Sequence, residues 1–414
     1  MNATPTTLTA IPATLSAAAA AAVPWQAIVI GAGPAGGAVA WSLATRGVKV
    51  LLIDRHILPR GKVCGCCLSP QALRELRLLG DDAIPDGIVS LAAVRIAHRS
   101  TCVRLPLSAG GVVSRELLDT HLVRQAIAAG CQWLPSARVV SIDDSRVSPT
   151  ATVTVAHAES SRPVGLHTAV AIIATGLADP VRIGSERMPG RAVGRRIAPR
   201  SRIGLGAVLA PTAADLPSGE LLMVIGREGY CGLVRLDDGR IDVAAAMDRA
   251  PLASHADPAA AVAALLSESA GHVGRMLPTP AALHAAGFRA TPALTRRAPL
   301  LAGSQGRIFR VGDAAGYVEP FTGEGIGWGL TSARLLVESL CPSSALLSEP
   351  SVNAASRYRL AHRRHFATRY TRCRLVAESL RHPSMVAAAV SVARAAPWAA
   401  RRLVPALIGG GVSR

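Results

Sequence analysis

The sequence predicts an α/β fold in which a parallel sheet with covering helices is interrupted by an inserted antiparallel sheet and followed by a helical tail. Two apolar runs, Ala27 to Ile30 and Val48 to Ile53, enclose a glycine-rich turn and a small-residue helix, which is the order of a strand-helix-strand unit. Short apolar runs between Arg202 and Met247, with a tight turn at Asp237-Asp238-Gly239, predict antiparallel strands. A mostly helical pattern begins near Ser351.

The glycine-rich turn is the clearest functional signal. Gly31, Gly33 and Gly36 lie where a tight turn lets backbone amides approach a pyrophosphate at the positive N-terminal end of a helix. The second strand ends at Asp54, about 20 residues past the turn, where a carboxylate can accept hydrogen bonds from an adenosine ribose. Together these features predict a dinucleotide site.

Capping residues mark the helices that follow. Ser69-Pro70 begins a helix that Gly80 closes, and Ser114 begins one that ends at Gly130. Further along, Asp257 and Pro258 begin a helix through Ser267.

Between these helices, apolar runs predict the remaining strands. They are Leu91 to Leu105, Trp133 to Ile142, Ala151 to Ala156, Ala169 to Ala174 and Arg307 to Val311. The last run is followed by the glycine-rich loop Gly316 to Gly327, which begins a helix through Leu340.

Composition excludes several classes. The chain has 414 residues, half of them apolar, which is enough for two or three domains or for one extended fold with a subdomain. The formal charge of +18 suggests nucleic acid, but Lys49 and Lys62 are the only lysines and the arginines are scattered over the whole length. Because aromatic residues are also few, we expect no nucleic-acid partner.

The eight cysteines comprise one cluster, Cys64, Cys66 and Cys67, and five isolated residues. This is not the pattern of a secreted disulfide framework. A zinc site would need a second Cys or His pair at matching spacing, and His56 is the one nearby candidate. We therefore expect no metal site.

The two ends of the chain are unusual. Residues 1–24 are rich in Ala and Thr and lack a basic segment, so they fit neither a secretory signal nor a membrane span and predict a disordered leader. Residues 384–412 are apolar but interrupted by arginines and prolines, which disfavours a span there too. We expect a cytoplasmic protein.

Two later segments converge with the glycine turn. Arg115 stands at the start of a helix, where its guanidinium can reach a phosphate or a flavin edge. Gly312-Asp313 follows a buried strand, where a carboxylate can accept hydrogen bonds from a ribityl chain. The continuation Gly323-Glu324-Gly325-Ile326 would direct helix N-terminal amides at a flavin oxygen that gains negative charge on reduction.

With these residues in place, the chain resembles the FAD-dependent oxidoreductases of the para-hydroxybenzoate hydroxylase fold, over about Trp25 to Leu340. Within them it is most similar to the geranylgeranyl reductase branch, through Lys62-Val63-Cys64-Gly65, Leu68-Ser69-Pro70 and Gly323 to Ile326. The resemblance implies a Rossmann-like FAD-binding domain with an inserted antiparallel substrate domain. The expected limits are 25–90, 106–200 and 300–345 for the FAD-binding domain, 91–105 and 201–299 for the substrate domain, and 351–414 for a basic helical tail.

The resemblance and the glycine turn together imply one set of cofactor-binding residues, with FAD as the cofactor. The set is Gly31, Gly33, Ala35, Gly36, Asp54, Arg55, Cys64, Gly65, Arg115, Gly312, Asp313, Gly323, Gly325 and Ile326. Cys64 is also the catalytic candidate beside the flavin, against the alternative of an inert buried cysteine. Tyr230 and Cys231 either line the substrate face or pack in the core, and Trp328 is expected in the core.

Two departures from the resemblance concern the site. Relatives carry Ala-Asp-Gly where this chain has Ala174-Thr175-Gly176, with Asp179 further on, so the acid of that motif is absent. Gly65-Cys66-Cys67 replaces a glycine-rich continuation in a loop that would border flavin and substrate. The substrate class therefore need not carry over.

Three functions remain open. The first is a reductase that passes hydride from reduced FAD to an alkene of an isoprenoid-like, lipophilic substrate. The second is a flavin monooxygenase that hydroxylates an aromatic or polyketide-type substrate, and the third is a non-catalytic FAD-binding electron-relay protein. Halogenation is disfavoured because the chain has no Trp-x-Trp-x-Ile-Pro segment.

Two alternatives also remain for the electron donor and two for the role of the tail. Because the chain has a single glycine fingerprint, a separate nicotinamide-binding domain is not evident. We therefore expect NAD(P)H to bind transiently as the electron donor, with a protein electron donor as the alternative. Arginines crowd the tail between Arg357 and Arg374, which predicts either peripheral association with an anionic membrane or a solvated basic helix.

Overall fold

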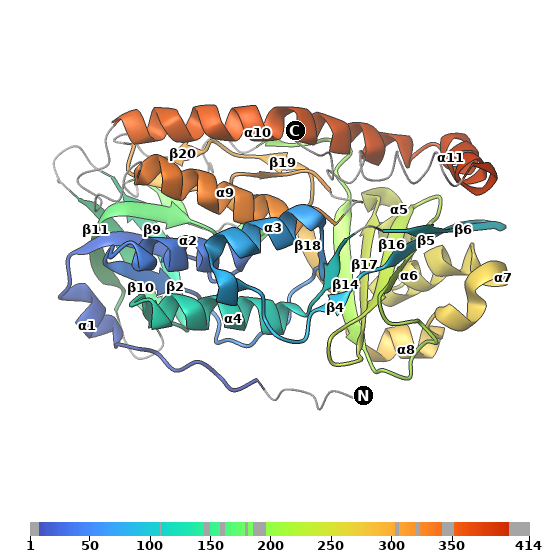
Figure 1. Ribbon diagram of the computed structural model, residues 1–414, viewed down its shortest axis with the longest axis horizontal. Helices are drawn as coiled ribbons and strands as arrows, with labels where there is room; N and C mark the ends of the chain where they lie inside the picture. Colours follow the sequence, from blue (N-terminus) through green and yellow to red (C-terminus); the bar gives the residue numbers. More distant parts are fainter. Residues whose placement is uncertain are drawn as a thin grey trace.

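The computed structural model describes residues 8–107, 109–144, 150–157, 162–178, 181–184, 196–302, 306–319, 321, 323–341 and 352–396. Within these residues the fold is the predicted α/β arrangement, with two large sheets side by side and helices covering both (Figure 1).

The first large sheet is parallel at its centre, in the order β8-β2-β1-β11-β21. Its strands are nearly continuous apolar runs because helices and loops bury both faces. Since parallel strands end at the same edge, the turns after β1, β2, β11 and β21 lie together. The bounds are β1 (Trp25–Ile30), β2 (Val50–Ile53), β8 (Gln132–Leu134), β11 (Val164–Ile173) and β21 (Ile308–Arg310).

The rest of this sheet corrects one prediction. The expected strand from Trp133 to Ile142 is broken at Pro135 and Ser136, because proline cannot donate a ladder hydrogen bond and Ser136 has a left-handed φ of 54°. The first piece, β8, pairs with β2, and the second, β9, pairs with β10. The remaining strands are β9 (Ala137–Asp143), β10 (Ala151–His157), β12 (Arg182–Ile183) and β20 (Leu301–Ala302).

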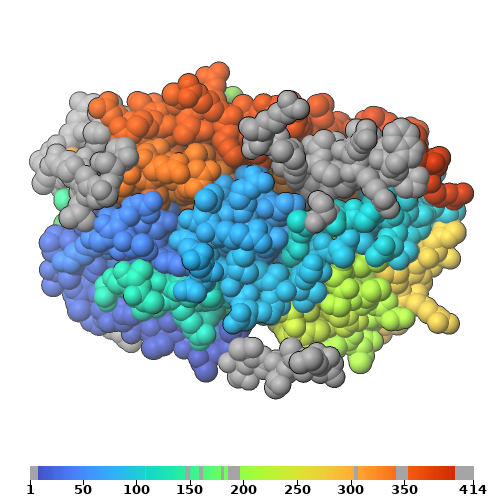
Figure 2. Space-filling view, in the orientation of Figure 1, coloured from blue at the N-terminus to red at the C-terminus, as the bar shows by residue number. Residues whose placement is uncertain are grey.

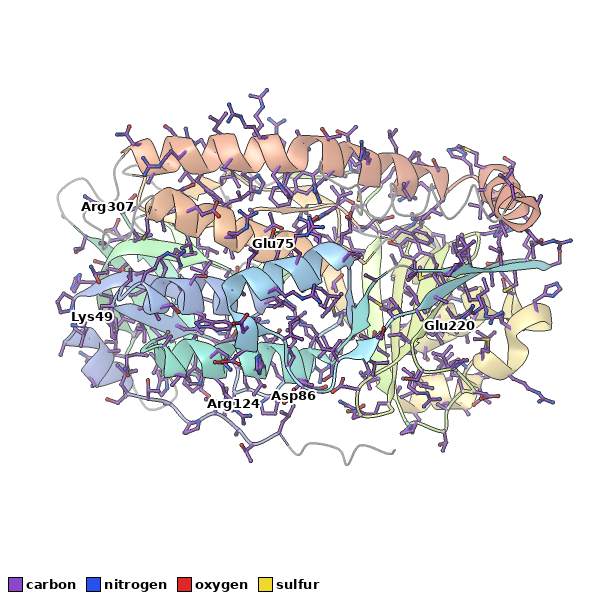
Figure 3. All side chains as sticks on the ribbon, in the orientation of Figure 1. Lys49, Glu75, Asp86, Arg124, Glu220 and Arg307 are labelled. Carbon is purple, nitrogen blue, oxygen red and sulfur yellow. The ribbon has the colours of Figure 1, made fainter. Side chains whose placement is uncertain are left out.

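The helices packed around this sheet begin as their caps predict. Ser69 Oγ accepts a hydrogen bond from the Ala72 amide, and Ser114 Oγ accepts one from the Leu117 amide. Helix α3 is also tied to α9 through Glu75, labelled in Figure 3, whose Oε2 lies 2.8 Å from Arg334 Nε. The bounds are α2 (Pro34–Thr45), α3 (Pro70–Leu79), α4 (Arg115–Ala128) and α9 (Gly325–Leu340).

The second large sheet is the inserted one, in the order β18-β14-β17-β16-β15-β5-β6. All its neighbours are antiparallel except β5 and β15, and Asp237-Asp238-Gly239 forms the turn between β16 and β17 as predicted. The predicted strand material from Leu91 to Leu105 folds into the β5–β6 hairpin. The bounds are β5 (Ala93–His98), β6 (Thr101–Pro106), β14 (Ile203–Leu209), β15 (Glu220–Ile225), β16 (Gly229–Arg235), β17 (Ile241–Met247) and β18 (Arg289–Ala293).

One face of this second sheet packs on short helices through an apolar core that contains Cys231 and Leu233. Asp257 caps the helix that the sequence predicts, with its Oδ1 2.8 Å from the Ala260 amide. The bounds are α5 (Arg249–Ser254), α6 (Pro258–Ser267), α7 (Ala270–Val273) and α8 (Pro280–Ala285).

Short elements join the two large sheets. One three-stranded sheet carries the Cys67 segment, and another carries the segment after Asp313. Their strands are β3 (Cys67–Leu68), β4 (Val89–Ser90), β7 (Gly111–Val112), β13 (Arg196–Ile197), β19 (Arg296–Arg297) and β22 (Gly316–Tyr317). The 3-10 turns are η1 (Asp81–Ala83), η2 (Gly176–Ala178), η3 (Gly274–Met276) and η4 (Gly312–Ala314).

The predicted disordered leader is wrong for residues 8–24, while residues 1–7 lie outside the described part. Helix α1 (Ala17–Ala21) is capped by Ser16, and its Ala20 carbonyl accepts a hydrogen bond of 2.9 Å from Trp25 Nε1. Ile11 is also buried in the core. The segment is ordered because small alanines fit closely against the sheet, so a composition typical of disorder still buries apolar surface.

The C-terminal helices are α10 (Val352–Ser379) and α11 (Pro383–Ala395). Helix α10 runs along α9 at one edge of the molecule, as the orange-red band in Figure 2 shows, and buries Tyr358, Phe366 and Tyr370. Helix α11 packs against β5 and β6. In the described part of the chain, no helix combines the length and apolar character needed to cross a lipid bilayer.

Candidate functional site

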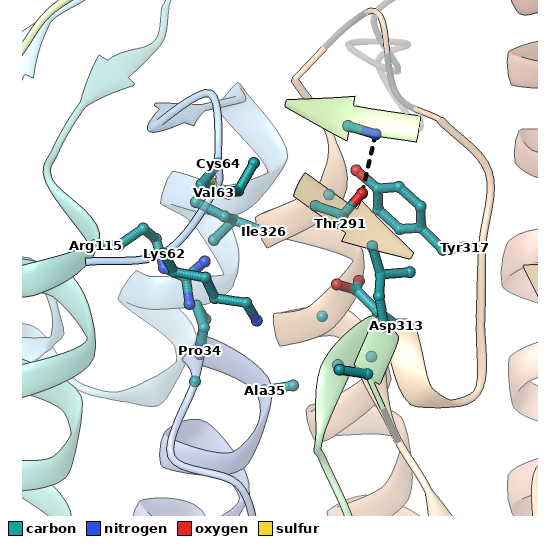
Figure 4. Close-up of a pocket in the computed structure, with 18 of the residues that line it drawn as sticks. Pro34, Ala35, Lys62, Val63, Cys64, Arg115, Thr291, Asp313, Tyr317 and Ile326 are labelled. Atoms are coloured by element: carbon teal, nitrogen blue, oxygen red, sulfur yellow. Dashed lines mark hydrogen bonds between the residues drawn. The ribbon is translucent and has the colours of Figure 1, made fainter. Parts of the chain in front are cut away.

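A cavity of about 480 Å³ opens where the carboxyl edge of the parallel strands meets the second sheet. Figure 4 shows that Lys62, Cys64 and Arg115 line one side of it and that Asp313 and Tyr317 line the other. In an open α/β sheet this edge is the usual place for a ligand.

The glycine turn after β1 is packed too tightly for other residues at two positions. Gly31 has φ +106°, and a Cβ there would lie 2.6 Å from the Ala174 carbonyl oxygen. A Cβ on Gly36 would lie 1.8 Å from the Gly31 carbonyl oxygen. Gly36 does not line the cavity. It instead lets α2 approach the turn closely.

Asp54, at the end of β2, lines the cavity and also fixes its walls. Its Oδ2 accepts a hydrogen bond of 2.8 Å from the Ala32 amide, and its Oδ1 accepts one of 2.9 Å from the His56 amide. Arg60 lies 3.3 Å from the same carboxylate. The acid therefore ties the glycine turn to the loop that begins at Arg55.

Arg115, the first residue of α4, is buried beside Cys64. Its Nε and Nη2 donate hydrogen bonds of 2.9 and 2.7 Å to the Asp119 carboxylate, which is fully buried. A hydrogen bond from Cys66 and the charge of Arg115 lower the pKa of the Cys64 thiol to about 5, although burial opposes this. This environment favours the thiolate form of Cys64.

Asp313 lies opposite, in the turn that follows β21. Burial raises the pKa of its carboxyl group, and the positive charges of Lys62 and Arg115 counteract that rise. Lys62 is a residue that the predicted set omits. Its Nζ lies 3.0 Å from where a Cβ on Gly176 would stand. Its rarity, as one of two lysines in an arginine-rich chain, is the signal that points to it.

The structure brings the predicted residues together, and all of them except Gly36 line the cavity. Those that line the cavity are Gly31, Gly33, Ala35, Asp54, Arg55, Cys64, Gly65, Arg115, Gly312, Asp313, Gly323, Gly325 and Ile326. Residues that line it but were not predicted include Lys62, Thr175, Leu177, Tyr317 and Phe321. Asp179, the acid displaced from the Ala174 motif, lies outside the described residues.

Two features of the cavity wall fit a long polar cofactor. The buried atoms Thr175 Oγ1 and Arg60 Nε line or adjoin the cavity and have no hydrogen-bond partner among the described residues. The wall also combines the backbone turn at Gly31, the start of α2 and the start of α9, which supply amides at positive helix ends. Among the described residues no His, Cys, Asp and Glu side chains cluster as a metal site.

The other end of the cavity is apolar and is formed by the face of the second sheet. Tyr230 lines it and contacts Phe321 edge to face at 5.1 Å, with the Arg202 guanidinium 5.5 Å from the Tyr230 ring centre. The neighbouring Cys231 points to the opposite face and packs in the core. Trp328 is buried among core aromatic residues, as expected. Other apolar lining residues are Leu177, Leu205, Leu221, Met223, Ala246 and Leu294.

Comparisons with known proteins agree with this geometry. Residues 25–167 match the family model described as FAD binding domain. The chain is 27% identical to the menaquinone reductase of Mycolicibacterium smegmatis over 338 residues, 75% of each chain. It is 36% identical to the geranylgeranyl diphosphate reductase of Rhodobacter capsulatus over 115 residues, 27% of each chain.

Solved structures share the fold at low sequence identity. A flavoprotein/dehydrogenase from Cytophaga hutchinsonii superposes with a TM-score of 0.73 at 16% identity, covering 94% of this chain and 93% of that one. The myxobacterial chondrochloren halogenase, an FAD-dependent enzyme, superposes with a TM-score of 0.67 at 20% identity, covering 84% and 81%.

Proposed function

Because the chain is an FAD-dependent oxidoreductase with the para-hydroxybenzoate hydroxylase fold, we propose that it reduces a carbon–carbon double bond in a lipid that carries an isoprenoid chain. When bound, FAD supplies the hydride that this reduction needs. The observation that carries the proposal is the division of the cavity into a polar end at the strand turns and an apolar end on the second sheet.

The polar end supplies the groups that would hold the cofactor. Gly31, Gly33 and Ala35 present the turn and the first amides of α2 to a pyrophosphate. Asp54 and Asp313, at two strand ends, offer carboxylate oxygens to sugar and ribityl hydroxyls. Gly325 and Ile326 begin α9, so their amides face the cavity with the positive end of the helix dipole.

Two cations, the half-buried Lys62 and the buried Arg115, set the charge of this end. Lys62 and Arg115 approach from the same side, with Asp313 opposite, and Arg115 is held in place by Asp119. Burial, followed by the charge of Arg115, lowers the pKa of the Lys62 ammonium group. Cations held in a site of low dielectric stabilise negative charge that develops near them during the reaction.

The apolar end supports a lipophilic substrate. Tyr230, Met223 and Phe321 pack around it, and burial raises the pKa of the Tyr230 hydroxyl, so it stays protonated. Such a wall excludes water and binds chains through apolar contact rather than charge. The two reductases named above are called after menaquinone and geranylgeranyl diphosphate. Both compounds carry isoprenoid chains, which supports this substrate class.

Product mass tests the proposal. FAD-reconstituted protein is supplied with NADH or NADPH and with an isoprenoid quinone or a prenyl diphosphate, and the products are analysed by mass spectrometry. Reduction adds two hydrogens to the substrate, whereas hydroxylation would add one oxygen and support the monooxygenase alternative. FAD-loaded protein whose flavin neither nicotinamide cofactor nor dithionite reduces would favour a non-catalytic FAD-binding role and contradict both enzymes.

We also propose that the outer face of α10 rests on an anionic membrane. Arg359, Arg363, Arg364 and Arg372 are exposed on this helix, and so are the apolar side chains of Leu360 and Leu375. Basic residues with interspersed apolar ones suit an anionic lipid surface.

Co-sedimentation with phosphatidylglycerol vesicles should fall severalfold in the R363E/R364E variant. The matched R227E/R275E variant, on exposed arginines of the second-sheet region, should sediment like the wild type; equal loss in both would contradict the proposal.

A further inference from the structure

Cys64 and Cys66 flank Gly65 on the cavity wall and are arranged for a reaction that the proposed reduction does not use. Both line the cavity, with Cys64 half-buried and Cys66 buried. The Cys66 Sγ lies 3.9 Å from the Cys64 carbonyl oxygen, and the Cys66 thiol hydrogen-bonds the Cys64 sulfur. The two thiols are therefore neighbours on one wall of the cavity, and the Cα separation of residues two apart, at most about 7 Å, overlaps the roughly 4.4–6.8 Å that disulfides span.

Cys64 is the nucleophile of this pair. It receives a hydrogen bond from the Arg115 guanidinium, which Asp119 holds through two hydrogen bonds. A thiolate beside a guanidinium, with part of its surface open to a cavity, is the usual environment of a reactive cysteine.

Cys66 is the partner that keeps its proton. Its hydrogen bond to Cys64 and its burial hold the pKa of its thiol well above the ordinary range. On its other side lies the buried carboxyl group of Asp242 on β17, which hydrogen-bonds the Cys66 thiol and whose charge also disfavours a Cys66 thiolate. A neutral thiol in contact with a thiolate is the arrangement of a resolving cysteine beside an attacking one.

We propose that Cys64 and Cys66 form a hydroperoxide-reactive thiol pair that closes into a disulfide at the cavity wall. The Cys64 thiolate attacks a peroxide oxygen, the O–O bond breaks, and the leaving oxygen takes up a proton as water or an alcohol. The Cys64 sulfenic acid is then attacked by the Cys66 sulfur, so that the S–S bond forms, the S–O bond breaks and the Cys66 proton leaves with the hydroxyl as water. The dithiol loses two electrons and the hydroperoxide gains them.

The pair would confine oxidation to a reversible state. A sulfenic acid with no resolving thiol proceeds to sulfinic acid, which most proteins do not repair, whereas a disulfide is restored by thiols. This reaction does not depend on the reductase activity proposed above, so failure of either proposal leaves the other to its own test.

Peptide mass spectrometry tests the pair directly. The FAD-reconstituted full chain is treated with a few equivalents of hydrogen peroxide, alkylated and digested with trypsin. Cleavage after Lys62 and Arg74 releases peptide 63–74, which holds Cys64, Cys66 and Cys67. We expect the peroxide-treated peptide to be two hydrogens lighter than the dithiol form and to carry one alkylated thiol, at Cys67. After reduction with dithiothreitol and a second alkylation, all three of its cysteines should be alkylated.

Variants separate the roles of the cysteines. C66A should let a dimedone-trapped sulfenic acid accumulate at Cys64 and then a sulfinic acid, while C64S should slow peroxide uptake at least tenfold. The matched control is C67S, because burial keeps the Cys67 thiol protonated and it should leave the Cys64–Cys66 disulfide unchanged. Three alkylated cysteines after peroxide treatment of the wild type, or a disulfide that includes Cys67, would overturn the proposal.

Discussion

At one end of the cavity the walls are backbone turns at the ends of parallel strands, and at the other end they are side chains on the face of an antiparallel sheet. The first end places glycines and charged groups such as Asp54 and Arg115, each tied by hydrogen bonds of 2.7 to 2.9 Å. The second places mainly apolar residues such as Met223, Leu221 and Ala246, which pack against one another and the Tyr230 ring. At the polar end, hydrogen bonds thus fix the positions of the lining atoms. At the apolar end, the side chains determine only the size and shape of the space.

This difference predicts that single changes at the polar end abolish cofactor binding, whereas changes at the apolar end only alter the choice of substrate. The largest effect on cofactor binding is expected at Gly36, where any Cβ would overlap the Gly31 carbonyl oxygen at 1.8 Å. G36A should weaken FAD binding by about 100-fold or more, which corresponds to about 3 kcal/mol. Flavin absorbance after gel filtration measures it.

The control for that change is G271A, where an added Cβ meets nothing within 4 Å. It should retain FAD and unfold at the wild-type temperature. If G36A kept its flavin as well as G271A does, the turn would not be the rigid frame of the polar end.

The buried Arg115–Asp119 pair gives the largest effect on folding stability. The side chains are 6% and 0% exposed, so R115A leaves a carboxylate buried without its partner. We expect the free energy of unfolding to fall by about 3–5 kcal/mol, measured by urea denaturation. R200A removes a partner of Glu378 whose pair is 66% and 47% exposed, and should change stability by less than about 1 kcal/mol. Equal losses would show that Arg115 is not specially anchored.

At the apolar end, the A246L substitution should change catalysis and leave the cofactor in place. The longer side chain fills part of the cavity beside Tyr230, so kcat/KM for a long isoprenoid substrate should fall about tenfold, or about 1.4 kcal/mol. Flavin absorbance should stay at the wild-type level. A264L, the same substitution on the exposed side of α6, should change neither. Loss of flavin from A246L would mean that the two ends are not separable.

The smallest effect is a pH profile. Because the pKa of Cys64 is lowered from 9.0 to about 5, the thiolate is present above that pH and alkylation by iodoacetamide should reach half its maximal rate near pH 5. Removing the Cys66 hydrogen bond with C66A should move this midpoint upward. Cys231, fully buried under the apolar face with a raised thiol pKa, should stay unreactive throughout. A midpoint above pH 8 for Cys64 would show that the polar end does not stabilise the Cys64 thiolate.

The contrast also explains what the sequence predicts well. Gly31, Asp54 and Gly312-Asp313 are required by backbone geometry at strand ends, and such requirements leave a signature at fixed spacing. Caps behave similarly: Asp257 and Pro258 predict α6 to the residue because the cap bonds are local. These features need no knowledge of distant contacts.

What the sequence leaves open depends on contacts between distant segments. The order of the leader at Ile11 and Ala20 depends on a surface built by later strands. Lys62 and Tyr317 meet across the cavity only because β21 lies beside β11. The apolar lining alternates with core positions along β16, so Tyr230 and Cys231 differ in role although they are neighbours in sequence.

The pairing of β21 with β11 has a consequence for how the protein is made. Gly31 and Gly312 face the same cavity but stand roughly 280 residues apart. At about 5–20 residues per second, a ribosome needs on the order of 15–60 s between them. During that interval the nascent chain contains the turn at Gly31 but not yet the segment around Gly312 that completes the polar end. Cofactor uptake is therefore a late event in the synthesis of the chain.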